Sequence, residues 1–221
     1  MGFLVWGHHM YLVGLDHRSR SLYSTVTVMI SLPAVVKLVN WTLTLQNSNL
    51  ETTPSLYYIF SFILFFLSGG ITGLWLSHVS LNVFVHDTFY VVAHFHFMFS
   101  CAVFSSIFAL YFHYYFLLWG FHFNKNLVYL HLFYWTCGQW VTFVPLFWVG
   151  YNGLPRRYHD YPLIFAGWHG LASAGHILSL ISVILFFVII LNSFFNKSLF
   201  SGKTVLVPRS YKRLQFYLRK I

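Results

Sequence analysis

Long runs of apolar residues, separated by short polar connections, make up most of this chain. A membrane-spanning helix needs about 20 mostly apolar residues, and five runs reach that length. They extend from Ser21 to Leu45, Leu56 to Leu76, Phe89 to Trp119, Leu127 to Val149 and Leu163 to Phe195. The pattern predicts an all-α, polytopic membrane protein with about five transmembrane helices.

The two ends of the chain differ from these runs. Residues 1–15 have the composition of the end of a further apolar segment, and we expect residues 1–196 to form one membrane domain. Residues 197–221 are rich in Lys and Arg. Basic segments stay on the side from which a chain is inserted, so we expect this tail on the inner side of the membrane.

Successive loops lie on alternate sides of the membrane. If the tail lies inside, five spans therefore place three polar clusters together on the outer face. These are the pair His8 and His9, the loop 86–87, and the pair Arg156 and Arg157. Outer-face arginines go against the usual distribution of positive charge. Paired guanidinium groups bind carboxylates in bidentate fashion, so we expect an anionic partner here, with lipid phosphates as the alternative.

The composition supports a membrane protein and excludes other classes. The chain is 58% hydrophobic and 8% charged, whereas soluble proteins have about 25% charged residues. Because much of the net charge of +9 lies in the tail, we do not predict nucleic-acid binding. Cys101 and Cys137 are far apart within apolar runs, which favours neither a disulfide nor a thiolate metal site.

Two histidines, two positions apart, interrupt the third apolar run. A helix turns by about 100° per residue, so the side chains of His94 and His96 leave it about 200° apart. Ionisable residues inside a membrane are functional candidates by default. One helix can thereby offer a ligand atom on each side, to two metals or hemes. Hydrogen bonds to neighbouring helices are the alternative.

Lys37 lies in the middle of the first apolar run, after Pro33. A lysine at the centre of a bilayer costs about 2.5–3.5 kcal/mol on insertion scales. A buried carboxylate partner is scarce, because the whole chain has only four Asp and Glu residues. The residues alone leave two possibilities, a role in proton transfer or a side chain that extends toward the interface.

Four motifs, taken together and in order, resemble subunit I of the heme-copper terminal oxidases, most closely the mitochondrial cytochrome c oxidase branch. They are WGHHM at residues 6–10, PAVVK at 33–37, HDTFYVVAHFH at 86–96 and GLPRRY at 153–158. The resemblance extends from about Gly2 to Asn196 and implies the C-terminal part of that subunit. It implies a twelve-helix fold, which this chain would complete together with a separate N-terminal chain.

The resemblance also implies the ligands of the metal centres. His94 would bind the iron of heme a3 and His96 the iron of heme a, with Phe95 between the two hemes. His8 and His9 would bind copper B, which accepts imidazole ligands. Without the resemblance, a His-His pair is more typical of polar residues at a membrane interface.

The outer loops receive further roles from the same resemblance. His86 and Asp87 would contribute to a magnesium site, although a hydrogen bond within the loop is the alternative. Arg156 and Arg157 would contact the heme propionates, which would provide their anionic partner. Lys37 would belong to the proton channel that leads from the inner face.

The implied function is that of a catalytic fragment of a respiratory-chain oxidoreductase, cytochrome c oxidase (complex IV), in the mitochondrial inner membrane. Electrons would pass from cytochrome c to heme a and then to the heme a3/copper B site, where oxygen is reduced to water while protons are pumped. The expected partners are the N-terminal chain, subunit II with its dicopper site, other complex IV subunits, cytochrome c and membrane lipid. The alternatives are a quinol-oxidising relative, a non-catalytic scaffold that retains the fold, and an unrelated transporter.

Three positions depart from the family's pattern, and none of them is an implied metal ligand. Ala34 replaces a threonine beside the proton channel, and Asn82 replaces an aspartate near the heme a3 propionate. Phe89 replaces one of two adjacent tyrosines. The departures bear on proton movement rather than on metal binding.

The split-subunit hypothesis predicts two polypeptides where the family has one. We expect intact-mass measurement of the purified complex to find a second chain that carries the third copper B histidine and the second heme a ligand. One continuous subunit I polypeptide in that measurement would contradict the hypothesis.

Overall fold

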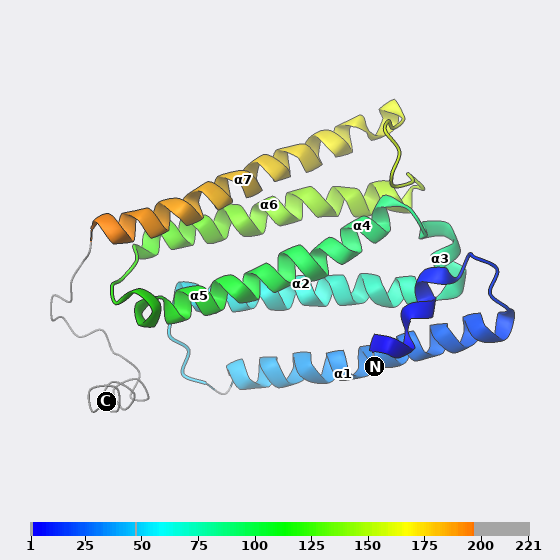
Figure 1. Ribbon diagram of the computed structural model, residues 1–221, viewed down its shortest axis with the longest axis horizontal. Coiled ribbons are helices and arrows are strands. Elements are labelled where there is room, and N and C mark those ends of the chain that lie inside the picture. Colours follow the sequence, from blue (N-terminus) through cyan, green and yellow to red (C-terminus); the bar gives the residue numbers. More distant parts are fainter. Residues whose placement is uncertain (1, 47, 197–221) are drawn as a thin grey trace.

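The computed structural model describes residues 2–46 and 48–196, and helices account for most of them (Figure 1). The long elements are α1 (His17–Gln46), α2 (Pro54–Ser77), the continuous stretch of α4 (Phe89–His96), η3 (Phe97–Val103) and α5 (Phe104–Trp119), then α6 (Lys125–Tyr151) and α7 (Ala166–Phe195). The short elements are η1 (Gly2–Leu4), η2 (Trp6–Met10), α3 (Val79–Val85) and η4 (Leu163–Phe165). The all-α prediction is confirmed, and the predicted tail at 197–221 lies outside the described residues.

Among the residues that the structure describes, four helical stretches are long and apolar enough to cross a membrane. They are His17–Gln46, Pro54–Ser77, Phe89–Trp119 and Leu163–Phe195. The fifth predicted span corresponds to α6, which has 27 residues but does not belong to this set. Its sequence is less apolar because it includes His131, Gln139 and several Trp and Tyr residues, and both of these polar side chains are buried.

Local sequence explains where the helices begin and end. Pro54 is the first residue of α2, a position where its missing N–H costs nothing. The Thr88 hydroxyl accepts a hydrogen bond from the Tyr90 N–H and caps α4 at 3.2 Å. Gly120 ends α5 with a φ of 76°, a left-handed conformation that glycine adopts easily. The predicted limits of the long helices are therefore close to the observed ones.

Three local features differ from the sequence-based prediction. The predicted polar connection at 77–88 contains helix α3. Its sequence VSLNVFV is mostly apolar and forms a short helix that buries Asn82 and Val85. The third span is not a uniform α-helix, since η3 is a stretch of π-helix directly after His96. The segment 1–15, expected to end a further apolar segment, forms the two short 3₁₀ helices η1 and η2.

The long helices pack in a row, with α1 at one edge and α7 at the other (Figure 1). Helix α2 packs against α1 on one side and against α5 and η3 on the other, α4 packs against α6, and α6 packs against α7. No residue of α1 is buried among the described residues. Helix α3, the start of α4 and the end of α6 lie at one end of the row, which brings the predicted outer loops together.

Close contact between α6 and α7 depends on Gly138. A Cβ atom at this position would lie 2.6 Å from Ser179 Oγ and 2.8 Å from the Ser179 backbone nitrogen. Small residues at a helix interface let two backbones approach within a membrane. The glycine therefore sets the distance between these two helices.

We expect Gly138→Ala to destabilise the α6–α7 pair by about 1–3 kcal/mol, the usual cost of overpacking. Thermal denaturation of the purified complex measures the effect. Gly170→Ala on α7 is the matched control, because a Cβ there has no atom within 4 Å. Equal denaturation temperatures for the two variants would contradict the role of Gly138.

Candidate metal centre

Helix α4 directs its two histidines toward different neighbours. The His94 Nδ1 atom lies 3.0 Å from the Gly69 carbonyl oxygen and 3.1 Å from Thr72 Oγ1, both on α2. The His96 ring stacks on Phe143 of α6, with ring centroids 4.7 Å apart and planes 17° apart. The two imidazoles therefore lie on opposite sides of one helix, as the spacing of two residues predicts.

Hydrogen bonding defines which nitrogen of each ring can bind a metal. A carbonyl oxygen can only accept, so the His94 Nδ1 carries the proton that it donates to Gly69. The His96 Nδ1 lies 2.7 Å from the Val92 carbonyl oxygen and is protonated for the same reason. Each ring then keeps the lone pair on Nε2. Metal-binding histidines commonly donate their other N–H to such a group, so both residues fit an iron ligand.

The His94 ring occupies space that a glycine leaves. A Cβ atom at Gly73 would lie 2.7 Å from His94 Cε1 and 3.4 Å from its Nε2. Sequence reasoning missed Gly73, Thr72 and Gly69, which together accommodate and orient this histidine. The small residues in GGITG interrupt a helix otherwise rich in Phe and Leu, and that contrast could have indicated a close contact.

His8 and His9 lie in η2 with their Nε2 atoms 3.0 Å apart. The His8 Nδ1 lies 3.2 Å from Thr27 Oγ1, and the Thr27 hydroxyl donates to the Tyr23 carbonyl. Thr27 therefore accepts from His8, which leaves a lone pair on the His8 Nε2. Imidazole nitrogens bind a metal at about 2.0–2.1 Å, so two nitrogens 3.0 Å apart could both reach one ion.

Adjacent residues of the 3₁₀ helix η2 point about 120° apart, so the approach of the two Nε2 atoms to 3.0 Å arises from the side-chain conformations. Within residues 2–46 and 48–196, no group of three or more His, Cys, Asp and Glu residues could hold a metal.

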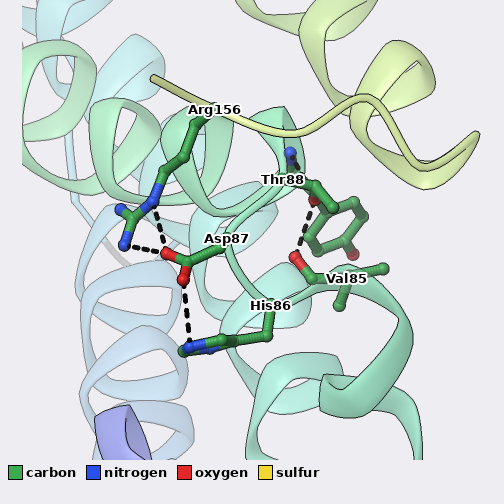
Figure 2. Close-up of polar contacts among 6 residues, drawn as sticks. Val85, His86, Asp87, Thr88 and Arg156 are labelled. Carbon is green, nitrogen blue, oxygen red and sulfur yellow. Dashed lines mark hydrogen bonds and ion pairs between the residues drawn. The ribbon is translucent and has the colours of Figure 1, made fainter. Parts of the chain in front are cut away.

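An ion pair joins the loop that contains Asp87 to the loop that contains Arg156, as Figure 2 shows. The Arg156 Nε donates to Asp87 Oδ1 at 2.8 Å, and its Nη2 lies 2.5 Å from the same oxygen. The other carboxylate oxygen, Oδ2, faces the His86 Nε2 at 3.5 Å. The sequence predicts separate sites for Asp87 and Arg156, whereas the structure brings the two residues together. The hydrogen bond from Arg156 lowers the pKa of Asp87.

Backbone contacts strengthen this loop connection. The Arg156 N–H donates to the Asp87 carbonyl at 2.8 Å, and the Phe89 N–H donates to the Leu154 carbonyl at 3.1 Å. Asp87 has a φ of 56°, an unusual value for a residue with a side chain. Because Thr88, which caps α4, directly follows Asp87, these contacts fix the beginning of the helix that carries both histidines.

The remaining predicted residues lie apart from this connection. Arg157 is exposed with a φ of 70°, and Phe95 stacks on the His96 ring with centroids 4.3 Å apart. Lys37 lies on α1 and is exposed, with its Nζ 5.4 Å from the centroid of the Trp41 ring. Ten residues separate Lys37 from Thr27, the partner of His8, which corresponds to about 15 Å along the helix.

Comparisons with known proteins point in one direction. A family model described as cytochrome c and quinol oxidase polypeptide I matches residues 1–185. The cytochrome c oxidase subunit 1 of Tetrahymena pyriformis is 53% identical over 221 residues, which cover 100% of this chain and 32% of that protein. The corresponding protein of Paramecium tetraurelia is 51% identical over 221 residues, which cover 100% of this chain and 34% of that protein. The chain thus spans about a third of the length of these relatives.

A solved structure supports the fold. A chain in the cryo-EM structure of a heme-copper terminal oxidase dimer superposes with a TM-score of 0.72 at 22% sequence identity. The match covers 86% of this chain and 39% of that chain. The helical arrangement described above is therefore shared with that protein.

The contact between Asp87 and Arg156 predicts a measurable coupling. We expect Asp87→Asn and Arg156→Leu each to lower the thermal stability of the complex, and the double variant to lose less than their sum. Exposed ion pairs contribute about 0.2–1 kcal/mol. Arg157→Leu is the control, because it removes the same charge without this hydrogen bond, and we expect no comparable coupling with Asp87→Asn.

The same pair has a defined pH dependence. Pairing lowers the pKa of Asp87 from its ordinary value of 3.8. Its contribution to stability is therefore complete above that pH and is lost as the pH falls through the lowered value. This role would be contradicted if the stability losses of Asp87→Asn and Arg156→Leu simply added in the double variant. It would also be contradicted if the coupling between the two variants persisted at strongly acid pH.

Proposed function

This chain belongs to the cytochrome c and quinol oxidase polypeptide I family, and from that membership we propose that it forms part of the catalytic core of a cytochrome c oxidase. The observation that carries the proposal is the placement of two imidazoles on opposite sides of α4, each with its Nδ1 at a backbone carbonyl. One rigid helix can then hold two separate irons at a fixed separation. Such an arrangement suits electron transfer from one heme to the other.

We assign His94 to the iron of heme a3, His96 to the iron of heme a, and His8 with His9 to copper B. When bound, these groups accept electrons and reduce oxygen to water. The residues of this chain hold and orient them, since the bonds to Gly69 and Val92 keep the Nε2 lone pairs available. Hydrogen bonding at Nδ1 also makes an imidazole a stronger ligand.

The outer loops would bind the charged parts of these groups and a cation. Arg157 is exposed, and we assign it with Arg156 to the heme propionates. His86 Nε2 and Asp87 Oδ2 would provide two of the ligands of magnesium, which favours oxygen ligands and retains several waters. The Arg156 contacts involve Oδ1, so Oδ2 remains for the cation.

The remaining ligands and the electron source belong, in this proposal, to other polypeptides. The N-terminal part of subunit I would supply the third copper B histidine and the second heme a ligand. Subunit II, with its dicopper site, would deliver electrons from cytochrome c, and further complex IV subunits and lipid would surround the chain in the mitochondrial inner membrane. Lys37 would carry protons from the inner face, so that oxygen reduction is coupled to proton pumping.

A quinol-oxidising enzyme is the second candidate, because the family's description includes quinol oxidases. The relatives reported above, both cytochrome c oxidase subunits, favour the first candidate. The purified complex distinguishes the two when it is supplied with reduced cytochrome c or with a quinol. Rapid oxidation of quinol alone would overturn the preferred assignment.

Variants of the two α4 histidines test the proposal directly. We expect His96→Ala to remove the low-spin heme signal and His94→Ala to remove the heme that binds carbon monoxide, because each ring serves a different iron. Absorption spectra and iron and copper analysis of the purified complex provide the measurement. His159→Ala, in an exposed loop, is the control with both hemes intact. The loss of the same heme in both α4 variants would contradict the assignment.

A further inference from the structure

Lys37 and Trp41 make a contact whose role the family assignment does not include. We propose that Trp41 is a positioning residue that holds the Lys37 ammonium group against its indole face. This inference rests on the proposed role of Lys37 in proton transfer. The Lys37 Nζ lies 5.4 Å from the Trp41 ring centroid, within the distance of about 6 Å that defines a cation–π interaction.

Helix geometry makes the contact a natural one. Residues four apart in an α-helix are neighbours on one side of it, and Lys37 and Trp41 have this spacing. Large side chains on a helix lean toward its N-terminus, over the preceding turn. The indole of Trp41 therefore lies over the turn that carries Lys37.

The neighbouring helix holds the Trp41 ring in place. The ring contacts Phe62 and Phe66 of α2, with centroid distances of 5.1 Å and 5.6 Å. The corresponding interplanar angles are 60° and 72°, close to the edge-to-face arrangement that aromatic pairs prefer. A ring restrained in this way presents a fixed face to the cation.

The four acidic residues of the sequence all lie outside the long helices, at Asp16, Glu51, Asp87 and Asp160. Within the described part of the chain, the ion pairs of these carboxylates involve His86 and Arg156 and not Lys37. The Trp41 ring is the group that the structure places against the Lys37 ammonium.

The contact offsets part of the cost of placing the charge in a membrane. An ionisable side chain inside a bilayer is costly, and a cation–π contact is strongest where it is desolvated. Lys37 lies nine residues before the end of α1 at Gln46, about 14 Å along the helix. At that position on α1, the contact with Trp41 holds the ammonium group without an ion pair within the described residues.

The experiment uses the assembled complex, with the rate of heme a3 reduction measured in the absence of oxygen across a range of pH. Without the contact, the ammonium is less favoured. We therefore expect Trp41→Leu to move the alkaline midpoint of the pH–rate profile to lower pH, by a factor of about 2 to 30 in proton concentration. Trp41→Phe should give an intermediate shift, because a phenyl ring binds a cation more weakly than an indole. Heme absorption verifies that each variant has assembled.

Two further variants separate the possible outcomes. Trp75→Leu makes the same change on an exposed residue of α2 and should leave the profile unchanged. Trp41→Leu should add nothing to Lys37→Met, which has no charge to hold. The inference is overturned if Trp41→Leu leaves the pH–rate profile unshifted. It is also overturned if Trp41→Leu slows heme a3 reduction equally in the presence of Lys37 and in the Lys37→Met background. A normal profile in Lys37→Met overturns instead the proposed proton-transfer role of Lys37.

Discussion

The bonds between the Nδ1 atoms of two histidines and two backbone carbonyls are the interactions on which the proposed centre depends. His94 and His96 would be expensive to place in a membrane if their polar atoms had no partners. Gly69 and Val92 satisfy one nitrogen of each ring and, in doing so, determine the nitrogen that faces away. Backbone carbonyls cannot change rotamer, so the direction of each remaining lone pair is built into the helices themselves.

The outer loops determine where this pair of rings lies. Helix α4 begins at a residue held from two directions, by its own threonine cap and by the contacts of Asp87 with Arg156. The strained backbone at Asp87 persists because the side-chain and backbone bonds to Arg156 both favour it. The contacts at the start of α4 set the position of this helix. The small residues of α2 then provide the space that the His94 ring occupies.

Apolar run lengths and helical angles were sufficient to predict much of this fold from the sequence. The long helices and the opposite directions of His94 and His96 follow from residue spacing alone. The pairing of Asp87 with Arg156 was not predictable in the same way, because it depends on the meeting of two loops distant in sequence. Helix α3 and the π-helical stretch η3 were missed for a related reason, since both involve too few residues to produce a periodic pattern. The space at Gly73 becomes evident only when α2 and α4 are placed together.

Helix α1 shows how strongly this chain depends on its surroundings. It has 30 residues and a largely apolar surface, yet the rest of the described chain buries none of them. Packing within the described chain therefore anchors α1 only weakly, and the surroundings of the helix must supply the rest of its stability. An unassembled chain would leave the Lys37 side chain exposed on α1.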